Sequence, residues 1–210
     1  MARASIVYVG TTEGLAIYSD PGGTGRWRRV GRVLDGQAIR GLLAADALNL
    51  VAVVDDGPPL RTTDGGQSWS PAAPADAEGL QALLKGSAPL VHTAQGPAQW
   101  RGSEPPAPDA SALALLAGKQ ETLIAARAGG ASLARSEDGG VTWSEAVVEG
   151  GLDGQVQTLA PASYHMDYIW AGTSAGQVLR SEDRGRTWQE VGREPAAVTC
   201  IAVMRIAGQA

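Results

Sequence analysis

The side chains best suited to acid–base chemistry in this sequence are carboxylates in segments that have the composition of loops. Two carboxyl groups that face each other across a cleft, about 5–9 Å apart, can hydrolyse a glycosidic bond. Asp55 and Asp56 are adjacent, and neighbouring side chains of an extended chain point to opposite sides. These two residues therefore cannot form such a pair, whereas Glu13 with Asp55 is a candidate pair for hydrolysis.

Metal and cofactor chemistry has little support in the sequence. It contains two histidines and one cysteine, too few for a His-based metal site without carboxylates. His92 lies in a strand-like run and is interpreted as structural, and Cys200 lies in an apolar run and is interpreted as a buried thiol. No phosphate-binding loop, dinucleotide fingerprint or nucleophile elbow occurs. We therefore predict no metal, no cofactor and no catalytic set.

The charge and hydropathy of the chain argue against several classes of partner. The formal net charge is −5 and there is no basic block, which argues against binding to nucleic acid or anionic membranes. No apolar run approaches the length of a membrane-spanning helix, and no secretion signal is visible at the amino end. We expect a monomeric, cytoplasmic protein that does not insert into membranes.

Three stretches share one pattern, Ser/Thr-x-Asp-x-Gly-x-Ser/Thr-Trp. In such a stretch the Asp carboxylate can accept backbone N–H bonds inside a tight turn, and the hydroxyl can add another. Gly adopts the positive φ that the turn requires, and Trp buries its ring against a neighbouring sheet. We interpret these residues as structural. They are Thr62, Asp64, Gly66 and Trp69, then Ser136, Asp138, Gly140 and Trp143, then Ser181, Asp183, Gly185 and Trp188.

Two further copies of the pattern are imperfect. Residues 19–27, with Ser19, Asp20 and Trp27, contain one extra residue, but the sequence before them matches residues 172–181 at a constant offset. The other copy lies between residues 80 and 110, where residues 80–86 resemble the inner strands of the other units and residues 89–96 resemble their second strands. Its turn aligns either with residues 101–104, which we prefer because of the spacing, or with residues 93–100.

These repeats resemble the Asp-box, or bacterial neuraminidase repeat, found in sialidases, in some xyloglucan-cleaving enzymes and in a photosystem II assembly factor. The resemblance covers nearly the whole chain and implies an all-β propeller of four-stranded blades. It leaves the function open. Sialidases of this family carry an Arg-Ile-Pro motif that is missing here, so sialidase activity is not predicted.

The units predict a single domain, residues 1–210, that forms a small β-propeller of five four-stranded blades with a shortened third blade. The first unit lacks its inner strand, and residues 198–204 look like an orphan inner strand. We therefore predict that the C-terminal strand completes the first blade and closes the ring, which hides the open sheet edges. The predicted blades are residues 198–206 with 5–33, 38–72, 80–110, 112–150 and 155–193.

In such propellers ligands usually meet the face that carries the loops between second and third strands. These loops are short here, and an interaction module without catalysis is the leading hypothesis, with an unknown protein or small ligand as partner. The alternative is a reduced glycoside hydrolase that uses carboxylates of this funnel face. The candidate binding residues on this face are Glu13, Asp55, Asp56, Gln95 and Thr173.

Recurring arginines and one aromatic stretch are two further features of the sequence. Arg61, Arg101, Arg135 and Arg180 recur immediately before the boxes, and this register suggests that they cover blade surfaces. Residues 164–168 form an aromatic stretch with the sequence Tyr-His-Met-Asp-Tyr. This stretch is either an edge that binds a partner or a long turn that packs on its own blade.

Overall fold

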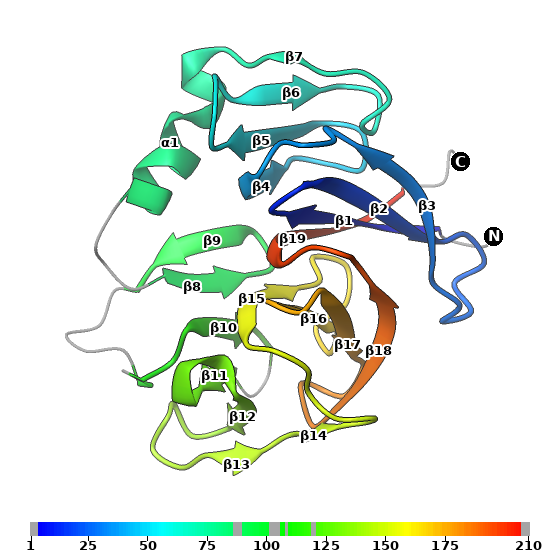
Figure 1. Ribbon diagram of the computed structural model, residues 1–210. Helices are drawn as coiled ribbons and strands as arrows, with labels where there is room; N and C mark the ends of the chain where they lie inside the picture. Colours follow the sequence, from blue (N-terminus) through cyan, green and yellow to red (C-terminus); the bar gives the residue numbers. More distant parts are fainter. Residues whose placement is uncertain (1–3, 86–89, 101–105, 108, 119–120, 207–210) are drawn as a thin grey trace.

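The computed structural model describes residues 4–85, 90–100, 106–107, 109–118 and 121–206. Four β-sheets stand around a central axis, in an all-β propeller (Figure 1). The strands of the first two sheets are β1 (Ser5–Thr11), β2 (Gly14–Asp20), β3 (Arg28–Val33), β4 (Ile39–Ala44), β5 (Leu50–Val54), β6 (Leu60–Thr62) and β7 (Ser70–Pro71).

The rest of the chain contributes the other two sheets and also β19, which joins the first sheet. Its strands are β8 (Leu90–Thr93), β9 (Gly96–Gln99), β10 (Ala112–Leu116), β11 (Thr122–Arg127), β12 (Ser132–Ser136), β13 (Ser144–Glu145), β14 (Val147–Val148), β15 (Val156–Pro161), β16 (Ile169–Thr173), β17 (Gln177–Ser181), β18 (Thr187–Arg193) and β19 (Val198–Arg205). Helix α1 (Pro74–Lys85) and a short 3-10 turn η1 (Ala128–Gly130) complete the described elements. Among all the described residues, no helix is long and apolar enough to span a membrane.

The C-terminal strand completes the first sheet, as predicted. Strand β19 pairs antiparallel with β1 from Ser5 opposite Arg205 to Thr11 opposite Val198, and the sheet order is β19-β1-β2-β3. The two ends of the chain are thereby held in one sheet. Tyr18 of this sheet also donates a hydrogen bond, 2.5 Å long, to the buried Glu194 carboxylate that follows β18 of the last sheet.

The predicted five four-stranded blades are reduced to four sheets. The third unit forms no sheet of its own among the described residues, because its expected inner strand is helix α1 and its hairpin β8–β9 joins the sheet of the next unit. Strand β8 pairs parallel with β10 through His92 and Ala114. Strand β8 therefore runs in the direction of an inner strand, not of the second strand that we predicted. The preferred turn of this unit, residues 101–104, lies outside the described residues.

Helix α1 forms because its apolar residues follow a helical period. Ala77 and Leu80 are buried and Leu84 is half-exposed on the same face, at the spacing of one helix stripe. Pro74 occupies the first turn, where its missing N–H is not needed. The helix packs closely on β4 at Gly41, where an added Cβ would come within 2.8 Å of Leu84 Cδ1.

The Asp-box turns have the geometry that the sequence predicts. In the last sheet the Ser181 hydroxyl donates to the Asp183 carboxylate at 2.8 Å, and this carboxylate accepts the Thr187 N–H at 2.9 Å. The Gly185 N–H donates to the Ser181 hydroxyl oxygen at 2.9 Å, and the Trp188 indole donates to the Gly185 carbonyl at 3.1 Å. The same bonds recur in residues 62–69 and 136–143.

The first box departs from this pattern. The Asp20 carboxylate accepts the Thr24 and Gly25 N–H groups at 3.1 and 2.7 Å, while the Ser19 hydroxyl donates to the Ser5 carbonyl instead of to Asp20. This box, which has one extra residue, is therefore closed by the Asp20 carboxylate and by a backbone bond from the Gly23 N–H to the Asp20 carbonyl at 3.3 Å, without the Ser19 hydroxyl. The Trp27 ring meets Trp170 of the last sheet edge-on, with ring centroids 4.6 Å apart.

The central glycine of each regular box packs against the preceding unit. A Cβ at Gly185 would lie under 3.0 Å from Ile124 Cδ1, and a Cβ at Gly140 would overlap Pro106 in the same way. Gly66 lies against Ile17, with a corresponding distance of 3.3 Å. The boxes therefore act both as turns and as contacts between neighbouring units.

Candidate functional site

The five inner strands of the propeller line a central cavity of about 480 Å³. Strands β4, β8, β10, β15 and β19 stand around the axis (Figure 1), and residues of these strands line the cavity together with Leu80 and Leu84 of helix α1. The volume lies within the range of small-molecule sites. A neighbouring cavity of about 360 Å³ lies along β4, β8, β15 and β19 and shares Leu42, His92, Pro97 and Ile201 with the first.

The titratable side chains in the wall of the central cavity are mostly neutral at physiological pH. Burial lowers the pKa of His92 to about 4 and raises the pKa of the Cys200 thiol to about 12. The imidazole is therefore unprotonated, and the thiol is not a thiolate nucleophile. Arg40 is the charged residue at the edge, and it forms an ion pair with Asp55.

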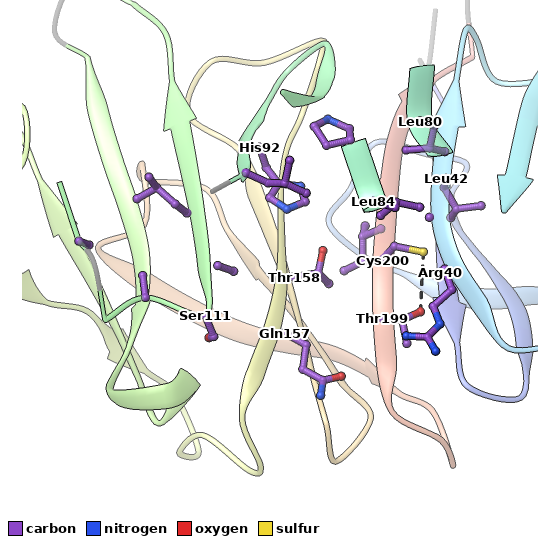
Figure 2. Close-up of a pocket in the computed structure, with 18 residues that line it drawn as sticks. Arg40, Leu42, Leu80, Leu84, His92, Ser111, Gln157, Thr158, Thr199 and Cys200 are labelled. Atoms are coloured by element: carbon purple, nitrogen blue, oxygen red, sulfur yellow. Dashed lines mark hydrogen bonds between the residues drawn. The ribbon is translucent and has the colours of Figure 1, made fainter. Parts of the chain in front are cut away.

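Thr158 supplies a polar group to this wall that has no partner in the described structure. Its side chain is 1% exposed, and its hydroxyl forms no hydrogen bond with the described residues. Figure 2 shows Thr158 on the cavity wall, with His92 on one side and Cys200 on the other. Buried hydroxyls normally have a hydrogen-bond partner, so this one is a ready contact for a bound molecule.

The predicted carboxylates lie at the rim, and none of them lines the central cavity. Glu13, in the turn between β1 and β2, has a carboxylate 3.8 Å from the Arg32 guanidinium. Asp55 follows β5 and pairs with Arg40, while Asp56 is exposed beside it. The structure does not bring the carboxylates together around a common point within the central cavity.

The other two candidate binding residues occupy different places. Thr173 is fully buried, and its hydroxyl oxygen accepts the Gln177 N–H at 3.0 Å, which closes the β16–β17 turn. Gln95 lies in the β8–β9 turn and lines the second cavity beside Ala45 and Met204. Because β8 runs parallel to β10, this turn lies at the end of the axis opposite Asp55, and its predicted place on the funnel face is wrong.

None of the described residues that line the central cavity was among the predicted site residues, and several of them carry polar or polarisable side chains on inner strands. His92, Thr158 and Cys200 are all on inner strands. Their positions in apolar runs made them resemble core residues, and the one available signal was that each is a polar or polarisable residue within an inner strand. Among the described residues no group of three or more His, Cys, Asp or Glu side chains could hold a metal ion.

Comparisons with known proteins identify the repeat. The family profile of the BNR/Asp-box repeat matches residues 60–71, which include the box in the second sheet. No curated protein sequence matches the chain.

Solved structures with a similar fold include one described as YCF48 bound to D1 peptide. It is 18% identical to this chain, the match covers 87% of this chain and 75% of that one, and the TM-score is 0.39. YCF48 from Cyanidioschyzon merolae has 15% identity, covers 87% of this chain and 68% of that one, and has a TM-score of 0.29. The GH74 enzyme of Niastella koreensis has 15% identity, with 93% of this chain but 25% of that chain covered and a TM-score of 0.34. This chain thus spans about a quarter of the length of that enzyme. The segment of residues 60–71 is thus a BNR/Asp-box repeat, carried on a small all-β propeller.

Proposed function

We propose that this propeller is a binding module that holds an uncharged ligand, or an uncharged segment of a protein partner, in its central cavity. The unpartnered Thr158 hydroxyl, 1% exposed in the wall of a cavity of about 480 Å³, is the observation that carries this proposal. A bound polar group would complete its hydrogen bonding, and the leucines of α1 would contact the apolar part of the ligand.

The low pKa of His92 supports a ligand without charge. A neutral imidazole and a neutral thiol offer no counter-charge to an ion inside the cavity, and burial of an unpaired charge is strongly unfavourable. Among the described lining residues, the one charged group at the edge, Arg40, already has Asp55 as its partner.

The arrangement of the carboxylates favours binding over glycoside hydrolysis. A hydrolase needs two carboxyl groups on either side of the substrate bond, roughly 5–9 Å apart. Glu13 and Asp55 each lie beside an arginine at the rim and do not line the cavity. Turnover of chromogenic glycosides that is abolished by Glu13→Gln or Asp55→Asn would overturn the binding proposal in favour of hydrolysis.

The binding proposal is tested by a ligand-observed NMR screen of uncharged fragments with a cavity-filling variant. Leu84→Trp places a larger side chain at a half-exposed position of the cavity wall, and Val147→Trp makes the same change at an exposed position of β14. We expect fragments that bind the wild type to be lost in Leu84→Trp and kept in Val147→Trp. Thr158→Val should weaken those with a hydrogen-bonding group. Fragments that bind all three variants like the wild type would refute the site.

A further inference from the structure

A separate cavity of about 290 Å³ lies at the seam between the first and last sheets, and none of its lining residues lines the central cavity. We call it the seam cavity. Its wall includes Trp27, which precedes β3, Tyr164 and Tyr168 of the β15–β16 loop, Arg180 of β17 and Arg205 at the end of β19. The aromatic stretch of residues 164–168 therefore packs at this seam.

Arg180 is held in a cage of aromatic rings. Its Cζ atom lies 4.6 Å from the centroid of the Tyr168 ring, 5.5 Å from that of Trp27 and 5.8 Å from that of Trp170. The Arg180 side chain is 9% exposed, and it forms an ion pair with Glu182. Cation–π contacts of this kind fix the guanidinium and strengthen as water is excluded. The seam cavity thus presents a positioned, largely desolvated cation.

Several hydrogen-bond donors around the seam cavity lack acceptors. Among the described residues, Nε of Arg180, Nε of Arg205 and the indole Nε1 of Trp27 are buried and have no hydrogen-bond partner. These nitrogen atoms only donate hydrogen bonds. Buried donors without partners are uncommon in folded proteins, and here these three, together with the Tyr164 hydroxyl, belong to residues that line one cavity. An acceptor from outside the described chain would complete them.

The neighbouring repeat shows which acceptor is missing at Arg180. Arg135 stands immediately before its box, as Arg180 does, but its Nε donates to the Arg184 carbonyl in the box of the next sheet at 3.3 Å. The sheet that follows Arg180 carries the irregular first box, and no described carbonyl reaches Nε of Arg180. The seam cavity therefore lies where a regular repeat would place a backbone oxygen.

We propose that the seam cavity binds the carboxylate of a small organic acid that carries one negative charge. The flat, two-oxygen carboxylate fits guanidinium donors, and two arginines line the cavity. Asp20 and Glu182, which already pairs with Arg180, also line it, so that a ligand with two negative charges meets more repulsion than a monovalent one. This site is independent of the central cavity and does not rest on the function proposed for it.

The test follows the indole N–H signals of the ¹⁵N-labelled full chain during titration with sodium acetate, at constant ionic strength set with sodium chloride. The Trp27 signal is assigned by its loss in Trp27→Phe. We expect a saturable shift of that signal with acetate and none with chloride alone. Arg180→Lys and Arg205→Lys keep the charge but remove the Nε donor, and each should weaken acetate binding at least tenfold. The matched control Arg135→Lys, whose Nε already has a carbonyl partner, should bind acetate like the wild type.

Three results would overturn the proposal. The first is an acetate shift of Trp27 no larger than that caused by chloride, and the second is equal weakening by Arg135→Lys and Arg205→Lys. The third is tighter binding of inorganic phosphate than of acetate, which would assign the site to a different anion. If Arg180→Lys does not fold, the partly exposed Arg205 and the wild-type titration still decide the question.

Discussion

The substitution Gly185→Ala tests how the Asp-box turns hold neighbouring units together. Gly185 has φ of +80°, and an added Cβ would lie under 3.0 Å from Cδ1 of the fully buried Ile124. An L residue in the left-handed region costs about 1–2 kcal/mol, and overpacking of a core typically costs about 1–3 kcal/mol. We therefore expect Gly185→Ala to lower the free energy of unfolding by about 2–5 kcal/mol, measured by urea denaturation with tryptophan fluorescence.

A second glycine, Gly139, separates the backbone cost of Gly185→Ala from the cost of its steric overlap. Gly139 has φ of +77° and nothing within 4 Å of an added Cβ, so Gly139→Ala should cost only the backbone part, about 1–2 kcal/mol. Ile124→Val removes the Cδ1 atom that the methyl group added by Gly185→Ala would meet, at a cost of its own of about 0.5–1.5 kcal/mol. In the double variant the steric overlap is relieved, so its loss of stability should be clearly smaller than the sum of the two single losses.

Two results would refute this reasoning. If Gly185→Ala and Gly139→Ala lose the same free energy of unfolding, the contact with Ile124 has no energetic weight. If the double variant loses the full sum, the overlap with Cδ1 is not the cause of the loss. In either case the box glycines would be turn residues alone, and not contacts between units.

Four further predictions concern other parts of the structure. Burial raises the pKa of Tyr8 from 10.0 to about 12. The stability that the neutral Tyr8 side chain contributes is complete below pH 10 and is lost as the pH rises to 12, by up to about 2.7 kcal/mol. In urea denaturation, the free energy of unfolding of Tyr8→Phe should therefore fall less between pH 10 and pH 12 than that of the wild type. Tyr18→Phe removes a hydrogen bond to the buried Glu194 carboxylate and should lower the free energy of unfolding by about 1.5–3 kcal/mol, whereas no change would show that the bond is not formed in solution. Deletion from Ala197 onward removes β19 from the first sheet and should give an insoluble chain without cooperative unfolding in circular dichroism; a folded monomer would contradict the closure. The His92 imidazole should titrate near pH 4 by NMR, and a midpoint near 6.5 would show that water solvates it freely.

The Asp-box turns could be predicted from the sequence because their bonds are local. Asp138 is bonded to Ser136 and Thr142, which lie two and four residues away, so the residue types and their spacing nearly specify the turn. The closure by β19 was also predictable, because an apolar strand without a place in the last repeat matched the strand missing from the first.

The third unit could not be predicted in this way. Its apolar residues 77, 80 and 84 fit a helix, but a short apolar run of this kind is also compatible with a buried strand. The helix packs where Gly41 of β4 leaves room for Leu80 and Leu84, a contact between segments far apart in the sequence. With that segment helical, β8 was free to pair with β10.

By itself, the sequence determined the repeat, the all-β propeller and the strand that closes it, because these depend on turn bonds within eight residues and on a pattern that recurs along the chain. Only the tertiary structure decided the number of sheets and which side chains meet at a site. Thr158, His92 and Cys200 come from three different strands of the central cavity wall, and the unpartnered donors of Arg180 and Arg205 come from two different sheets. Whether a polar atom finds a partner depends on its neighbours in space, and those are set by the packing of distant segments.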